Sequence, residues 1–142
     1  EYMEDNRNIG SERLRGMEAN FNQTVDLLYR IMGPKIAFRR PRNRLSPVDG
    51  RWNLRSINGA IYESQMIVYS CLPSVREISE GQQQEIKKKT FSVFRDDVYW
   101  DAISQGTATK NRVRNRAVRL HNLLSEIDSL EIESLNSVFA TH

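Results

Sequence analysis

The sequence of 142 residues is poor in the residues that break or cross-link a chain, with one cysteine, four prolines and seven glycines. A lone Cys71 cannot form an internal disulfide, so we interpret it as a small buried residue and expect a reducing, cytoplasmic location. No apolar run approaches the roughly 20 residues of a membrane span, and no segment resembles a signal peptide. The single cysteine argues against a disulfide-rich secreted domain, and the lack of long apolar runs predicts that the chain does not bind a membrane.

Long alternating apolar and polar runs, which are typical of strands, are also missing. With 39% hydrophobic and 27% charged residues, the composition is that of a folded chain. We therefore predict an all-α fold with five to seven helices in an irregular bundle. We interpret residues 1–142 as a single helical domain. Because the sequence opens without Met, in what reads as the last turns of a helix, we expect a fragment of a longer protein.

Capping residues and apolar spacing predict helices over about 12–32, 53–72, 80–95, 98–104, 110–127 and 129–139. Gly33 and Pro34 end the first of these helices. Ser79 and Gln82 form a capping-box pattern before the third. Asp96 and Asp97 cap the fourth, which Gly106 closes, and Thr109 caps the fifth. The same spacing predicts these core residues: Leu14, Phe21, Leu28, Ile57, Ile61, Val68, Phe94, Val113, Leu120 and Leu124.

Positive charge is concentrated in two zones, although the net charge is only +3. In the first, residues 35–60, Asp49 is the one acidic residue among the basic residues Lys35, Arg39, Arg40, Arg42, Arg44, Arg51 and Arg55. We interpret its Arg- and Pro-rich part, 39–52, as a basic loop. Phe38 and Trp52 lie within this zone, and basic groups interleaved with aromatic rings suit nucleic-acid backbones and base stacking. A merely solvated loop is the alternative.

The second zone opens the predicted helix over 110–127 with Lys110, Arg112, Arg114, Arg116 and Arg119. A cation near a helix N-terminus interacts unfavourably with the helix macrodipole and destabilises the helix by roughly 0.3–1 kcal/mol. We therefore expect acidic neighbours or an anionic partner. At about 100° per residue, Arg112, Arg116 and Arg119 fall within about 60° of one another and form a ridge beside the apolar stripe. The arginines of this ridge would pair either with DNA phosphates or with acidic groups, which belong to the C-terminal tail or to other domains. For DNA, Lys110, Arg39, Arg40 and Arg42 complete the predicted contact set.

Patterns that support catalysis or metal binding are missing from the sequence. His121 and His142 belong to no HxxxH pair, and no CxxC occurs. The segment Gly106–Lys110 lacks the second glycine and the Lys-Ser/Thr pair of a phosphate-binding P-loop. We therefore expect no catalytic residue, no cofactor and no metal ion in this chain.

Several short segments follow one another in a recognisable order. Ala37-Phe38-Arg39 follows the helix ending at Gly33, Asn58 to Glu63 reads N-x-A-x-x-E, and Ala102 to Arg116 reads AI-x-x-GT-x-x-K-x-x-V-x-x-R. In this order they resemble the helical C-terminal half of the ParB-like domain of GmrSD-type bacterial restriction proteins. The resemblance covers about residues 1–127 and implies a role in phage defence, by restriction of foreign and often modified DNA.

This chain departs from that family at its catalytic end. The DGQQR motif, which such proteins use for nucleotide binding and hydrolysis, is missing, and Glu80 to Gln84 begins a helix in the wrong half. The HNH nuclease domain of many members is also missing. The resemblance therefore implies that the chain supports a nucleotide-processing core or contacts DNA, with that ParB-like core and an HNH domain as partners. A structural or protein-interaction domain with no nucleic-acid role is the alternative.

Overall fold

A computed structural model describes residues 20–45, 47, 52–104 and 110–136 of the chain. Residues 20–32 are helical, and four further helices follow in the described part: α2 (Gly59–Tyr69), α3 (Glu80–Ser92), α4 (Asp97–Ser104) and α5 (Lys110–Ser125). Short 3-10 turns cover Val75–Glu77 (η1) and Val93–Arg95 (η2). No strand occurs in these ranges, so the predicted all-α class is confirmed.

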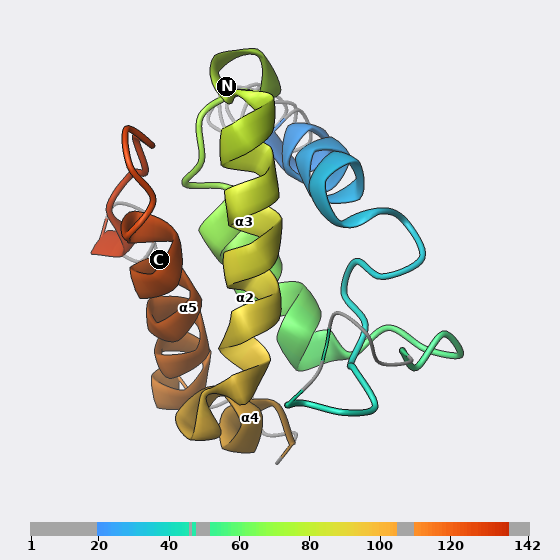
Figure 1. Ribbon diagram of the computed structural model, residues 1–142. Helices are drawn as coiled ribbons and strands as arrows, with labels where there is room; N and C mark the ends of the chain where they lie inside the picture. The colour runs from blue at the N-terminus through green and yellow to red at the C-terminus, as the bar shows by residue number, and fades with distance from the viewer. Residues whose placement is uncertain (1–19, 46, 48–51, 105–109, 137–142) are drawn as a thin grey trace, which may run out of the picture.

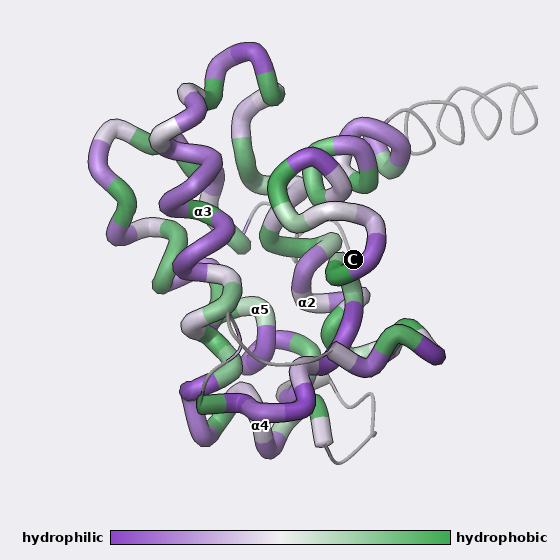
Figure 2. The backbone as a smooth tube through the Cα atoms, turned by 45° about the vertical axis from the view of Figure 1, so that its right-hand side comes forward, coloured by the Kyte–Doolittle hydropathy of each residue, from purple (hydrophilic) through white to green (hydrophobic). Residues whose placement is uncertain are grey.

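Helix α5 is the element around which the other helices are arranged. It packs against α2, α3 and α4, while the 20–32 helix lies on the far side of α2 and α3 from α5 (Figure 1). Hydrophobic and hydrophilic residues alternate along the helices (Figure 2), as expected where one side of each helix faces the interior. The core therefore lies between α5 and its three neighbours and continues on the other side of α2 to Leu28 and Met32 of the 20–32 helix.

Most of the core residues predicted from helical spacing are buried. Six are completely buried: Leu28, Ile61, Val68, Phe94, Leu120 and Leu124. Val113 is half-buried, and Leu14 lies outside the described residues. The prediction is wrong for Phe21 and Ile57, whose exposed fractions are 46% and 51%.

Ile57 is exposed because the second helix begins later than its apolar pattern predicts. The Asn58 side chain accepts hydrogen bonds from the N–H groups of Ala60 and Ile61, each at 3.0 Å, and thereby caps α2 at Gly59. Residues 53–58 are not helical, so Leu54 and Ile57 do not share the buried face of α2. The predicted helix over 53–72 is thus shorter at both ends.

Other helix ends follow the local chemistry of the sequence. Gly33, with a φ of +87°, ends the first helix. The capping box of Ser79 and Gln82 is present, and Asp96 accepts hydrogen bonds from Val98 and Tyr99 at the start of α4. Helix α5 begins at Lys110 as predicted. Gly106 and Thr109 lie outside the described residues.

The predicted final helix over 129–139 is wrong in its first half. Ser129 has a φ of +61°, and residues 130–134 are not helical. The Glu133 N–H donates to the Cys71 carbonyl (2.9 Å), and the Glu133 carbonyl lies 2.7 Å from Nε2 of His121. Hydrogen bonds to distant parts of the chain therefore replace those that a helix would have made here.

Candidate functional site

The basic loop over 39–52 is anchored at both ends by aromatic side chains. Phe38 is buried with a φ of +65°, its N–H donates to Oε1 of Gln65 (3.0 Å), and its ring centroid lies 4.9 Å from that of Tyr62. At the other end, the partly buried Trp52 packs 5.4 Å from the ring of Phe91. Base stacking on Phe38 is therefore excluded, because the ring belongs to the core.

Hydrogen bonds between backbone groups join the two ends of the loop. The Asn53 N–H donates to the Arg40 carbonyl at 3.0 Å, and Pro41 and Trp52 form an isolated antiparallel bridge. The Asn58 N–H donates to the Phe38 carbonyl at 2.9 Å. These bonds bring the two sides of the loop together where it leaves the helical body.

Two arginines of the loop hold it against the rest of the fold. The Arg44 guanidinium donates to the carbonyls of Phe94 (3.2 Å) and Arg95 (3.0 Å) and forms an ion pair with Asp97 at the start of α4. Arg39 donates to the Leu54 carbonyl at 3.3 Å. Arg44 therefore acts as a structural residue, whereas the buried Nε of Arg39 has no hydrogen-bond partner among the described residues.

Three other arginines surround an open hollow beside Trp100. This hollow, the Arg–Trp basin, has a volume of about 610 Å³ and is lined by Arg40, Pro41, Arg42, Asn53, Arg55 and Trp100. The Arg40 guanidinium carbon lies 4.3 Å from the centroid of the Trp100 ring, and its Nη2 donates to Ser104 (3.2 Å). Arg42 and Arg55 are exposed, and neither guanidinium has a hydrogen-bond or ion-pair partner among the described residues. None of the described residues that line the basin carries a carboxylate.

The basic residues of α5 do not form the exposed ridge that their spacing predicts. Arg116 is only 3% exposed, and its Nε donates to the Arg112 carbonyl at 3.2 Å. Arg119 lies 3.6 Å from a carboxylate oxygen of Asp96, the residue that caps α4. Arg112 is half-buried and Arg114 is exposed, while the side chain of Lys110 lies outside the described residues.

The prediction for Arg116 fails because α5 has neighbours on more than one side. It contacts α2 and α4 as well as α3, so positions beside its apolar stripe are covered too. The phenol of Tyr99 is completely buried and lies 2.7 Å from the Ser64 hydroxyl. Burial raises the pKa of Tyr99 to about 12, against the opposing effects of this hydrogen bond and of the Arg116 charge. Arg116 thus belongs to the polar interior near Tyr99.

The two basic zones meet at α4, but only part of their charge is left for a partner. Arg44 and Arg119 pair with Asp97 and Asp96 at the start of that helix. Four residues that line the basin were not in the predicted contact set: Pro41, Asn53, Arg55 and Trp100. Trp100 shares one side of α4 with Asp97 and Ser104, next to the side that buries Tyr99 and Ile103, and the polar residues on it were the signal that a loop docks there.

No protein-family model, curated protein or solved structure matches this chain. The resemblance to GmrSD-type proteins therefore stays a prediction. In the described part of the chain, no group of three or more histidine, cysteine or acidic residues is placed to hold a metal ion. None of the described helices is long and apolar enough to cross a membrane.

Proposed function

We propose that this chain binds the phosphate backbone of DNA through the Arg–Trp basin, as a non-catalytic helical part of a GmrSD-like restriction protein. The observation that supports this proposal is the grouping of Arg40, Arg42 and Arg55 around one open hollow whose described lining residues include no carboxylate. A guanidinium presents a planar fork of N–H donors that matches two phosphate oxygens. The site therefore has the chemistry of phosphate recognition.

The basin favours phosphates over bases. Phe38 is buried in the core, and Arg40 covers one face of Trp100 at 4.3 Å. Few groups remain to read base edges, and contacts to phosphates position a protein without specifying a sequence. We expect weak binding that depends strongly on salt and little on sequence.

The resemblance to GmrSD-type proteins gives this proposal its biological setting. In such a protein the nucleotide-processing core would lie in the half of the ParB-like domain that this sequence does not include. The chain would support that core and add contacts to the DNA backbone. Under this proposal, the isolated chain hydrolyses neither nucleotides nor DNA.

A purely structural or protein-interaction domain is the second candidate. It is favoured by the internal use of Arg44, Arg116 and Arg119, which contact carbonyls or carboxylates of the same chain. On this view the charge of both zones serves to hold the loop and α5 against α4.

Fluorescence anisotropy with a labelled DNA duplex tests the proposal. Each neutralised phosphate contributes about 0.9 to the slope of log affinity against log salt, so three arginines give a slope of about −2.7. The affinity should then fall about 40-fold between roughly 50 and 200 mM salt. In Arg42→Ala/Arg55→Ala the slope should become shallower, at about −0.9. The affinity of this variant should then decrease only about 3.5-fold over the same salt range.

The matched control is Arg30→Ala/Arg76→Ala, which removes two exposed arginines outside the basin. Net charge falls equally in both variants, so a general charge effect lowers both slopes alike. If the phosphate site is local, the salt slope becomes shallower only in Arg42→Ala/Arg55→Ala. If both variants keep the slope of the unmodified chain, or lose it equally, the structural alternative is correct. Circular dichroism verifies that both variants are folded.

A further inference from the structure

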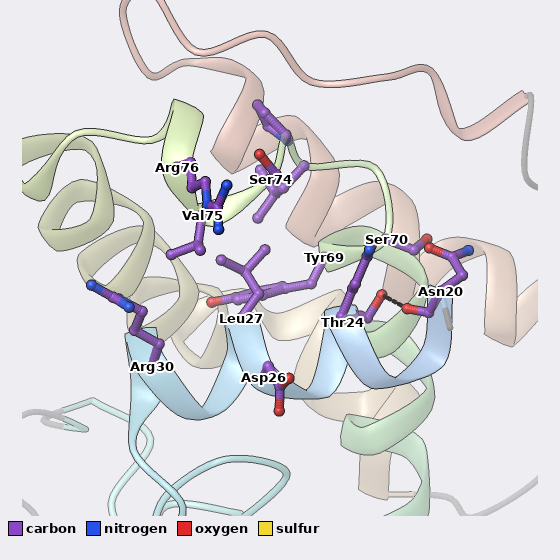
Figure 3. A pocket seen from close by; sticks show the side chains of 13 residues that line it. Asn20, Thr24, Asp26, Leu27, Arg30, Tyr69, Ser70, Ser74, Val75 and Arg76 are labelled. Atoms are coloured by element: carbon purple, nitrogen blue, oxygen red, sulfur yellow. Dashed lines mark hydrogen bonds between the residues drawn. The ribbon is translucent and has the colours of Figure 1, made fainter. Parts of the chain in front are cut away.

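A second and larger cavity lies between the 20–32 helix and the segment that follows α2 (Figure 3). Its volume is about 740 Å³, and it shares no lining residue with the Arg–Trp basin. Small-molecule sites usually enclose roughly 300–1,000 Å³. The cavity therefore has the size of a site for a small organic molecule.

Apolar groups cover much of the wall of this cavity. Leu27 and Tyr69 are buried in the fold beneath it, and Leu72, Pro73 and Val75 contribute from the segment after α2. The Tyr69 hydroxyl lies 2.7 Å from the Thr90 hydroxyl, which does not line the cavity. Tyr69 is only 1% exposed, so its ring lies beneath the cavity and the half-buried Leu72, Pro73 and Val75 present the accessible apolar surface.

Positive charge is concentrated at one end of the cavity. Arg30 from the first helix and Arg76 from η1 lie at this end, with Asn20 at the other (Figure 3). Neither guanidinium has a hydrogen-bond or ion-pair partner among the described residues. Among the described residues of the lining, Asp26 is the one carboxylate, and it has no ion pair with another described residue.

Two of the neutral polar groups are already satisfied. The Thr24 hydroxyl donates to the Asn20 carbonyl (2.8 Å), and the Ser70 hydroxyl donates to the Ile67 carbonyl. The side chains of Asn20, Gln23 and Ser74 remain to hydrogen-bond a ligand beside the two arginines and the apolar part of the wall.

We propose that this cavity binds a small organic anion with an apolar body. Arg30 and Arg76 hold its phosphate, sulfonate or carboxylate group, and Leu72, Pro73 and Val75 contact the body. This site is separate from the Arg–Trp basin and does not rest on the proposed binding of DNA.

The anionic dye anilinonaphthalene sulfonate is a direct probe, because it joins a sulfonate to an aromatic body and fluoresces in apolar surroundings. Titration of the whole chain should show saturable binding to one site. Arg30→Ala/Arg76→Ala should weaken this binding at least tenfold, whereas Arg42→Ala/Arg55→Ala should leave it unchanged. In amide proton–nitrogen NMR spectra, the dye should shift signals of Leu27, Arg30, Tyr69 and Arg76.

Dye binding of equal strength in both variants, or NMR shifts confined to other residues, would overturn the proposal, as would the absence of binding. If the alanine variant does not fold, Arg30→Gln/Arg76→Gln removes both charges while it keeps most of the side-chain volume, and the same tenfold loss is expected. The DNA titration is a separate measurement with the opposite dependence on the two variants. Failure of one site is thus distinguishable from failure of the other.

Discussion

Replacement of Arg116 by alanine tests whether this side chain belongs to the interior. It is 3% exposed, and its Nε donates to the Arg112 carbonyl. The change removes two buried methylenes, Cγ and Cδ, which costs about 1.6 kcal/mol. Loss of a hydrogen bond from a charged donor costs about 1.5–3 kcal/mol more. Part of this cost is recovered, because folding of the alanine variant no longer removes a guanidinium cation from water. We therefore expect Arg116→Ala to lower the free energy of unfolding by about 3 kcal/mol in total.

For a chain of this size, such a loss lowers the melting temperature by roughly 6–12 °C. Urea unfolding and thermal denaturation, both followed by circular dichroism, measure the effect. Arg114→Ala is the matched control on the same helix. Because Arg114 is exposed, water screens the interaction that its side chain makes, and its loss should change the unfolding free energy by less than about 1 kcal/mol. Arg116→Met keeps an apolar stem and should fall between the two.

An effect of Arg116→Ala as small as that of Arg114→Ala would refute this reasoning. It would mean that Arg116 is on the surface, as its angular position on the helix alone predicts, and it would restore the ridge as a candidate for DNA contact. An Arg116→Met variant as unstable as the alanine variant would show that the charge, rather than the stem, carries the stabilisation.

Two further predictions concern stability and its dependence on pH. Asn58→Ala removes the two hydrogen bonds that begin α2 and should lower the unfolding free energy by about 1 kcal/mol in urea denaturation, whereas Asn58→Asp should retain most of it. Tyr99 has a pKa raised by burial from 10.0 to about 12, so its contribution to stability is complete below pH 10. This contribution is lost as the pH rises from 10 to 12, because the unfolded chain releases the phenolic proton first. Tyr99→Phe should therefore reduce the fall in stability over this interval, and unchanged pH profiles would contradict the assignment.

Helix ends were predictable wherever one local group determines them. The capping box of Ser79, the Asp96 cap and the φ of Gly33 depend only on residues within a few positions, which the sequence shows directly. The start of α2 was missed because Leu54 and Ile57 continue the apolar spacing although Asn58 caps the helix after them. The non-helical segment 130–134 was missed because its hydrogen bonds reach Cys71 and His121, which are far away in sequence.

The basic loop was predictable as a loop, but its partner was not. Arg40 contacts Trp100 and Ser104, about 60 positions further along the chain, and charge patterning carries no information on that pairing. Helical spacing likewise identified the apolar stripe of α5 correctly, with Leu120 and Leu124 buried. It could not show how many neighbours surround α5, and that number decides whether Arg116 is buried or exposed.

Because backbone hydrogen bonds join its two ends, the basic loop can vary in length. Since Phe38 and Trp52 fix the two ends and the Arg40–Asn53 hydrogen bond closes them, we expect residues inserted beside Leu45, which is 65% exposed, to leave the packing of the helices unchanged. Doubling the length of a closed loop costs only about 0.6 kcal/mol in entropy. The loop is therefore a place where evolution can extend or shorten the chain, and where a peptide tag or a fluorescent label can be introduced, while the helices around α5 keep their packing.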